Sequence, residues 1–261
     1  MTKISAYVIA YNEAEKVAAT LASLGWCDEV ILVDSHSTDG TIEIANSMGA
    51  RVVQVDFQGF GHLRNEALKA CSGNWILSVD ADERCTPEVQ QEVQQIIHAT
   101  DALDVYLVPR RNYFMGRWIR HSGWYPNFRQ PQLFRKGALN YDLKPVHEGY
   151  MLNTNKPVGV LKNAIWQFPF KNTAELLHKA NRYSTLGAAK LVGKKVSMSK
   201  ALTHGFWAFI KHYIFKLGIL DGWPGFVIAL GNFEGTFYRY VKALEKQNEE
   251  KWKSPTGIRP D

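Results

Sequence analysis

Two carboxylates two residues apart, Asp80 and Asp82, follow a mostly apolar segment at residues 75–79 that has the length of a buried strand. Residues two apart along a strand share a face, so both side chains are expected to point the same way. Neighbouring carboxylates repel each other unless a cation or hydrogen-bond donors lie between them. Oxygen ligands of this kind suit Mg²⁺ or Mn²⁺, which share substrate phosphates. The pattern predicts a divalent cation holding a phosphorylated ligand. The alternative is an acidic turn before a helix that begins at Thr86 and Pro87.

Alternating strand and helix patterns put these acids at the end of a fourth strand. Strands are expected at residues 4–10, 30–33, 51–55 and 75–79, and helices at 12–24, 42–48, 62–70 and 87–98. This order calls for a parallel sheet covered by helices. Ligands bind such sheets at the carboxyl ends of the strands. Asn12 is predicted to cap the first helix, and Asp39 and Gly40 to form a turn in which the glycine has a positive φ.

Length and cysteine content limit the class of protein. A chain of 261 residues fits one large domain or a domain with an appendage. The three cysteines are an odd number without a CxxC pair, which argues against a disulfide framework and a thiolate metal site and for a reducing compartment. Residues 4–10 are predicted to be a first strand and not a signal peptide.

The second half of the sequence has a different pattern. A strand is expected at residues 105–108, short strands and loops over 113–149, and helices at 172–189, 198–217 and 226–246. Residues 171–261 hold 15 Lys and Arg against 7 Asp and Glu, whereas residues 1–170 hold 16 against 18. We expect a catalytic domain at 1–170 (halves 1–100 and 101–170), a basic, aromatic helical region at 171–250 and a disordered tail at 251–261.

Aromatic and basic residues are interleaved along residues 206–216, and no apolar run reaches the ~18–20 residues needed to span a bilayer. Interleaving of this kind is typical of helices that lie in a membrane interface, where anionic lipids attract Lys and Arg. The alternative is that these helices pack on the catalytic domain or form a homo-oligomer interface. No nucleic-acid-binding motif is present, so nucleic acid is not an expected partner.

Four motifs follow one another in the first ninety residues: YVIAYNE (7–13), VDSHSTDGT (33–41), RNEAL (64–68) and VDADE (79–83). Together they resemble a family 2 inverting glycosyltransferase. The resemblance implies an α/β, GT-A (Rossmann-like) fold, in which a mostly parallel sheet is flanked by helices; here it carries a C-terminal helical membrane-associating appendage. Such an enzyme binds a nucleotide-sugar at the carboxyl edge of the sheet and transfers the sugar to an acceptor hydroxyl with inversion.

The resemblance also implies roles for individual residues. Asp82 would bind the cation, while Asp80 would face the ribose or a metal-bound water. Where many relatives have a second acid that accepts the imino proton of the base, this chain has Ser35, whose uncharged hydroxyl can still accept that hydrogen bond. The remaining residues expected at the nucleotide-sugar are Ala10, Tyr11, Glu13, Asp34 and, near the diphosphate, Arg64.

Inversion requires a general base on the acceptor side, and Glu148 is the leading candidate, with Asp142 in reserve. His147 is a candidate metal or phosphate contact. The alternative is that His147 and Glu148 are an ordinary strand–turn pair. A His-Glu sequence at this place resembles that of the bacterial lipopolysaccharide inner-core glucosyltransferases. Aromatic and polar side chains at Trp124, Arg129, Gln132 and Arg135 suit an anionic sugar acceptor, or else form a subdomain core with surface arginines.

The sequence therefore predicts a metal-dependent hexosyltransferase that uses Mg²⁺ or Mn²⁺ and a UDP-sugar, with glucose as the leading donor sugar. The expected acceptor is a lipid-linked anionic saccharide such as the lipopolysaccharide inner core. The expected location is peripheral, on the cytoplasmic face of the inner membrane. The alternatives are another lipid-linked or polysaccharide acceptor, an aspartyl-phosphate phosphatase, or a non-catalytic nucleotide-sugar-binding protein at the membrane surface.

Overall fold

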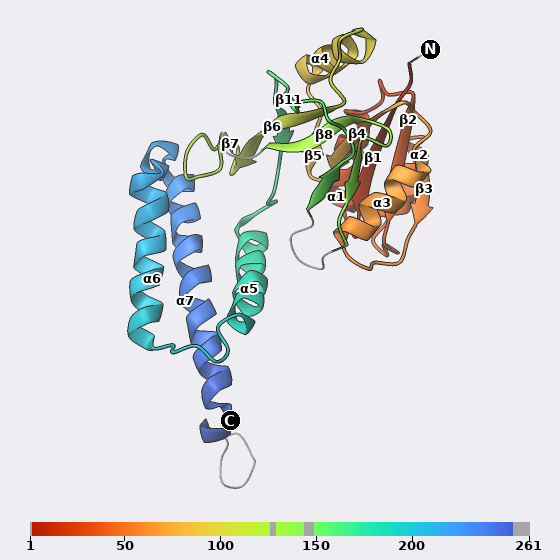
Figure 1. Ribbon diagram of the computed structural model, residues 1–261. Helices are drawn as coiled ribbons and strands as arrows, with labels where there is room; N and C mark the ends of the chain where they lie inside the picture. Colours follow the sequence, from red (N-terminus) through yellow and green to blue (C-terminus); the bar gives the residue numbers. More distant parts are fainter. Residues whose placement is uncertain (1, 126–128, 144–148, 253–261) are drawn as a thin grey trace. The chain divides into compact units, whose positions relative to one another are not determined.

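A computed structural model describes residues 2–125, 129–143 and 149–252 of the protein. The chain folds into two compact units (Figure 1). The sheet unit contains residues 1–111 and 128–168, and the helical unit contains residues 112–127 and 169–261. Most of the predicted tail at 251–261 lies outside the described residues.

The sheet unit is built on four parallel strands, β1 (Ile4–Ala10), β2 (Glu29–Asp34), β3 (Arg51–Gln54) and β4 (Trp75–Asp80), in the order β3-β2-β1-β4. The chain builds outward from β1 to β3 and then returns to the other side of β1, so the switch point lies between β1 and β4. Beyond β4 the sheet continues with β8 (Arg129–Arg135), which runs antiparallel to β4, and then with β6 (Val105–Phe114), which runs antiparallel to β8. The predicted parallel sheet is thus confirmed for its first four strands, and the whole sheet is mixed.

Helices cover both faces of this sheet, which explains why its central strands are apolar on both sides. Along β1, Ala6 and Val8 pack with α1 (Ala14–Ala22), α2 (Thr41–Ser47) and α4 (Pro87–His98). The alternate residues Tyr7 and Ile9 pack with α3 (Phe60–Ala70). The period of two along the strand therefore assigns each side chain to one helical layer.

The first turns of α4 and α1 are capped in two different ways. Thr86 Oγ1 accepts a hydrogen bond from Val89 N at 3.3 Å, as predicted for the N-cap of α4. The prediction that Asn12 caps α1 is wrong. Asn12 adopts φ 54°, and its side chain accepts from Thr38 N, whereas the first amide of α1, Ala14 N, donates to Asp39 Oδ2 at 3.1 Å. A carboxylate from the neighbouring loop thus replaces the local cap.

Short strands complete the sheet unit: β5 (Glu83–Arg84) pairs with β12 (Ile165–Gln167), β9 (Leu139–Tyr141) pairs with β10 (Tyr150–Leu152), and β11 (Gly159–Val160) pairs with β6. Cys27, Cys71 and Cys85 are free thiols.

The helical unit consists of α5 (Thr173–Ala189), α6 (Met198–Ile210) and α7 (Trp223–Trp252), with β7 (Arg117–Trp118) paired to the end of β6. Between α6 and α7 lie a π-helical turn, η1 (Lys211–Phe215), and a 3₁₀ turn, η2 (Gly218–Asp221). The predicted helix at 198–217 therefore leaves α-helical geometry after Ile210. The helix predicted at 226–246 is longer than expected at both ends.

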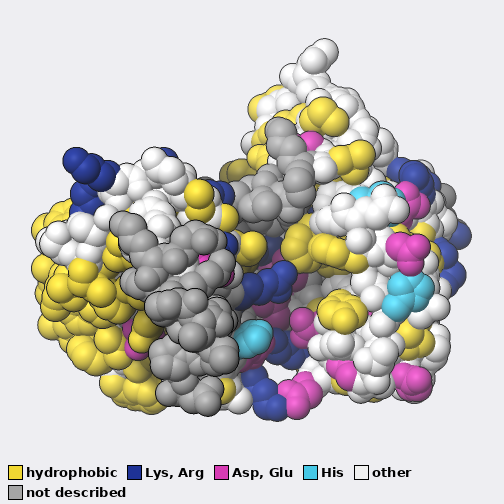
Figure 2. Space-filling view, turned by 90° about the horizontal axis from the view of Figure 1, so that it is seen from below, with side chains coloured by type: hydrophobic (Ala, Val, Ile, Leu, Met, Phe, Trp, Pro, Cys, Tyr) yellow, Lys and Arg dark blue, Asp and Glu magenta, His cyan; other side chains and the backbone are white. Residues whose placement is uncertain are grey.

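Much of the apolar surface of the helical unit is not covered. Hydrophobic side chains gather along the side of this unit at the left of Figure 2. Its small core contains Phe114, Ile119, Leu176 and Ile228. Among the described residues, no helix is both long and apolar enough to cross a bilayer.

Candidate active site

The ends of three neighbouring strands meet at the switch point. Asp80, the last residue of β4, pairs with Ile9 of β1, and the next residue, Ala10, pairs with Asp34 at the end of β2. The structure therefore brings Ala10, Asp34 and Asp80 to one edge of the sheet. In open α/β sheets, this edge beside the switch point is where ligands bind.

Two buried arginines hold the Asp80 carboxylate. Arg64 from α3 donates from Nη2 to Asp80 Oδ1 at 2.7 Å and from Nη1 to Ser78 Oγ at 3.1 Å. Arg110 from β6 donates from Nη2 to Asp80 Oδ2 at 3.3 Å. The arginines are 7% and 4% exposed. Because both carboxylate oxygens are engaged, Asp80 is oriented by the protein itself.

Beneath Asp80 lies Glu83, a fully buried carboxylate. Its Oε2 accepts from Asp80 N at 2.9 Å and from Gln132 Nε2 at 2.8 Å, and its Oε1 contacts Arg110 Nε. Burial raises the pKa of Glu83, and the Arg110 charge opposes that rise. Gln132 also donates to Ser78 O at 3.0 Å. Glu83 and Gln132 thus fix the backbone from which the two aspartates project.

Asp82 differs from Asp80 because no arginine is bonded to its carboxylate among the described contacts. Gln167 Nε2 donates to each of its oxygens at 3.3 Å. Thr20 Oγ1 donates to the intervening Ala81 O at 2.6 Å, which fixes the turn between the aspartates. Burial, and next the charge of Asp80, raise the pKa of Asp82. The surroundings of Asp82 therefore destabilise its ionised form, and a bound cation would stabilise that form.

The donor set around Asp82 fits a hard divalent cation. The described residues contain no group of three or more His, Cys, Asp or Glu side chains that could hold a metal. Mg²⁺ does not need such a cage, because it commonly uses one or two carboxylates and takes its other ligands from water and substrate phosphates. Asp82 supplies one carboxylate at the edge where a phosphorylated ligand is expected. The residues present are therefore compatible with Mg²⁺ or Mn²⁺.

Features suited to a nucleoside lie at the ends of β1 and β2. Tyr11 directly follows β1 and is 62% exposed, so its ring is accessible to a ligand. Ser35 is 7% exposed, and its Oγ has no hydrogen-bond partner among the described residues. Asp34 is fully buried and accepts from Ser37 N at 2.8 Å and from the Ser37 hydroxyl. The neighbouring Glu13 is half-buried, and its backbone N donates to Thr41 Oγ1 at 2.9 Å. Asp34 is thus used in a turn, while the Ser35 hydroxyl is buried with an unused acceptor.

The family model for glycosyl transferase family 2 matches residues 5–158. The chain belongs to this family. The predicted resemblance and GT-A fold are thereby confirmed, and the phosphatase alternative is excluded.

Relatives match this glycosyltransferase over nearly its whole length. An uncharacterized glycosyltransferase of Rickettsia felis is 31% identical, covering 94% of this chain and 90% of the relative. The lipopolysaccharide core biosynthesis glycosyltransferase LpsC of Rhizobium meliloti is 31% identical, covering 93% and 91%. Among solved structures, glucosyl-3-phosphoglycerate synthase of Mycobacterium tuberculosis is 26% identical with a TM-score of 0.36, and the match covers 43% of this chain and 44% of that chain.

In this chain, not all of the predicted acceptor residues lie at the carboxyl edge of the sheet, where Asp80 is. Arg135 pairs with Trp75 at the start of β4, five residues and about 16 Å along the strand from Asp80. There it binds Asp104 at 3.2 Å and lies over the Trp75 ring. Gln132 is buried beneath the aspartates and is not available to an acceptor. Arg129 begins β8, where its backbone pairs with Pro109.

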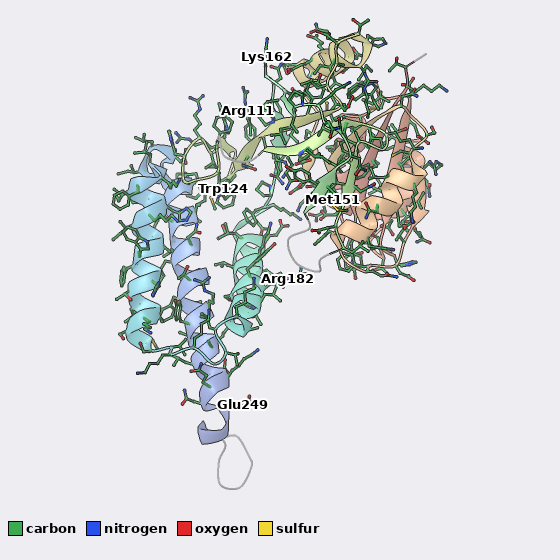
Figure 3. All side chains as sticks on the ribbon, in the orientation of Figure 1. Arg111, Trp124, Met151, Lys162, Arg182 and Glu249 are labelled. Atoms are coloured by element: carbon green, nitrogen blue, oxygen red, sulfur yellow. The ribbon has the colours of Figure 1, made fainter. Side chains whose placement is uncertain are left out.

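Two further predictions concern other parts of the chain. Trp124, labelled in Figure 3, belongs to the helical unit. Its ring packs against Phe114 and Phe170. The predicted base Glu148 and the predicted metal contact His147 lie outside the described residues. The reserve base Asp142 accepts from Gly149 N at 2.9 Å.

Proposed function

We propose that this glycosyltransferase moves a sugar, with glucose the leading candidate, from a UDP-sugar to a lipid-linked anionic saccharide such as the lipopolysaccharide inner core. The observation that carries the proposal is the contrast between Asp80, which two arginines hold, and Asp82, to which no arginine is bonded among the described contacts. The similarity to LpsC supports an acceptor of the lipopolysaccharide core class. We place the reaction on the cytoplasmic face of the inner membrane, with the enzyme bound peripherally.

In this proposal Asp82 would hold Mg²⁺ or Mn²⁺, with Gln167 orienting its carboxylate. When bound, the cation supplies positive charge beside the diphosphate that leaves with the nucleoside. Tyr11 provides an aromatic wall for the nucleoside. The buried Ser35 Oγ accepts a hydrogen bond from the imino N–H of uracil and so supports a uridine donor. Arg64 acts on the diphosphate side through Asp80, to which it is bonded.

Transfer with inversion is a single displacement. The acceptor oxygen attacks the anomeric carbon, the bond from that carbon to the diphosphate breaks, and the hydroxyl proton passes to a base. We propose Glu148 as this base.

Replacing Glu148 by Gln should lower the rate of transfer by about 10²-fold, because general-base catalysis contributes that much or more. The KM for the donor should change little. Steady-state kinetics measure both constants, and the exposed Glu245→Gln serves as a matched control. Full turnover in Glu148→Gln would remove this assignment and leave the rest of the proposal intact.

Metal and donor dependence can be tested together by measuring UDP release from UDP-glucose with purified inner-core acceptor. We expect turnover that EDTA abolishes and that added Mg²⁺ or Mn²⁺ restores. Other UDP-sugars and other lipid-linked or polysaccharide acceptors, run in parallel, define the donor sugar and the acceptor class. Turnover that is insensitive to EDTA would contradict the proposed role of the cation. Turnover with non-uridine donors alone would contradict the proposal that the donor is a UDP-sugar.

A further inference from the structure

The connection between α6 and α7 exposes an unusual density of large apolar side chains. Within twelve residues, six of them lie on the surface, and Phe215 and Trp223 are each 65% exposed. We call the six the tip patch: Phe215, Leu217, Ile219, Leu220, Trp223 and Phe226. They lie on η1, on the short link from η1 to η2, on η2 and on the first turn of α7, at one end of the helical hairpin (Figure 1). Exposed apolar clusters of this kind mark interaction surfaces.

Close backbone packing holds the tip patch in this conformation. A Cβ atom at Gly218 would lie 2.6 Å from His212 O, and one at Gly225 would overlap the carbonyl oxygen of Gly218. These glycines therefore let η1, η2 and α7 approach one another more closely than other residues allow. Leu217 lies in the left-handed region at φ 54°. Because the backbones of η1, η2 and α7 pack this closely, little space is left between them for side chains. The apolar side chains of the tip patch therefore point to the surface.

The charge around the tip patch has one sign. From residue 196 to residue 233 the only acid is Asp221, which is 1% exposed. Its carboxylate accepts from Arg120 N, His121 N and Ser122 Oγ, so it anchors the loop after β7. Lys211 on η1 and Lys216, which directly follows η1, are exposed. The first residue of β7, Arg117, is also exposed and donates to Leu220 O at 3.2 Å.

We infer that the tip patch docks on an anionic phospholipid surface. Its aromatic and aliphatic side chains would enter the interfacial layer while Lys211, Lys216 and Arg117 meet the headgroups. Long basic side chains at the edge of an apolar surface suit this arrangement because their stems are apolar and their heads stay in the polar layer. A second copy of the chain fits less well: lysine is depleted in protein interfaces, and two such faces would oppose like charges. The inference rests on the proposed function, in which the acceptor is lipid-linked, and it adds the surface by which the enzyme reaches the membrane.

Co-sedimentation of the full chain with phosphatidylcholine vesicles, with and without phosphatidylglycerol, tests this inference. We expect binding to the anionic vesicles that weakens as salt is raised. Phe215→Ser/Trp223→Ser should lower the partition coefficient at least about tenfold, because two large apolar side chains no longer enter the lipid. Lys211→Gln/Lys216→Gln should lower it about 30-fold on anionic vesicles, from roughly 1 kcal/mol per basic residue, and leave binding to neutral vesicles unchanged.

Matched controls come from the same unit. Tyr183→Ser/Leu186→Ser removes two exposed side chains of α5, and Lys190→Gln/Lys194→Gln removes two charges from the α5–α6 connection, at the other end of the hairpin (Figure 1). These variants should bind vesicles like the unaltered chain. Far-UV circular dichroism checks that all variants are folded.

Equal binding by the patch variants and their controls overturns the inference. So does a dimer in sedimentation velocity that the patch variants abolish, in a chain that does not bind vesicles. The vesicle assay contains no donor, acceptor or added metal. Loss of the docking result therefore leaves UDP release untouched, and failure of the UDP-release assay leaves the docking result untouched.

Discussion

Replacing Asp82 by Asn should lower UDP release by at least about 10³-fold, because a neutral amide is a poor ligand for a hard cation and several kcal/mol of charge stabilisation is lost. The side chain keeps its size and can still bond to Gln167, so the turn between β4 and β5 should persist. The measurement is steady-state UDP release at saturating Mn²⁺ and UDP-glucose. Asp101→Asn, an exposed acid after α4, is the matched control and should retain full activity.

The stability of the same variant separates loss of function from loss of fold. Burial and the charge of Asp80 raise the pKa of Asp82, so in the metal-free protein the ionised carboxylate is destabilising at neutral pH. Its neutral replacement should not lower the unfolding temperature measured in EDTA. A fall in that temperature together with the loss of activity would mean that Asp82 supports the fold, and a fully active Asp82→Asn would remove it from the proposed cation site.

The sequence was sufficient for the parallel half of the fold because that half follows local rules. The bounds predicted for β1 and α4 agree with the structure, and the other elements in residues 1–98 differ by a few residues at their ends. Apolar strands alternate there with amphipathic helices, and the handedness of such connections leaves few arrangements. The shared edge of Asp80, Asp34 and Ala10 follows from that order alone.

The antiparallel half could not be predicted in the same way, because its strands take their partners from distant parts of the chain. β8 lies between β4 and β6 and runs opposite to β4, so it enters near the carboxyl edge at Arg129 and leaves at the opposite edge at Arg135. Treating residues 124–135 as one acceptor surface missed this reversal. Neither composition nor spacing indicates which edge each residue reaches.

The same long-range pairing explains why Glu83 and Arg110 received no role from the sequence. Glu83 directly follows Asp82, but nothing in its neighbourhood reveals that it is fully buried. Arg110 becomes its partner only because β6 pairs with β8, which in turn pairs with β4. Glu83 and Arg110 are 27 positions apart in the sequence, so their pairing can be recognised only in the structure.

That buried pair gives the largest stability effect we expect. Glu83→Leu and Arg110→Met should each lower the free energy of unfolding by about 3–5 kcal/mol, because each removes one partner of a buried ion pair. The double variant should lose less than the sum, with a coupling of at least about 2 kcal/mol, since apolar side chains of similar volume then face each other. Urea unfolding of all four proteins measures the cycle. The surface pair Glu66–Lys69, in which the lysine is exposed and the glutamate half-buried, should show a coupling below about 1 kcal/mol when it is altered in the same way.

The double variant also separates the structural contribution of the pair from its contribution to the site. Once Glu83 and Arg110 are gone, Asp80 keeps Arg64 but loses its second guanidinium and the acceptor of its backbone N–H. We therefore expect a folded protein with a raised KM for UDP-glucose and low turnover, because the aspartates are no longer held in register. A stable double variant with unaltered kinetic constants would mean that the pair serves only the fold, and that Arg64 and Gln167 are sufficient to orient the two aspartates.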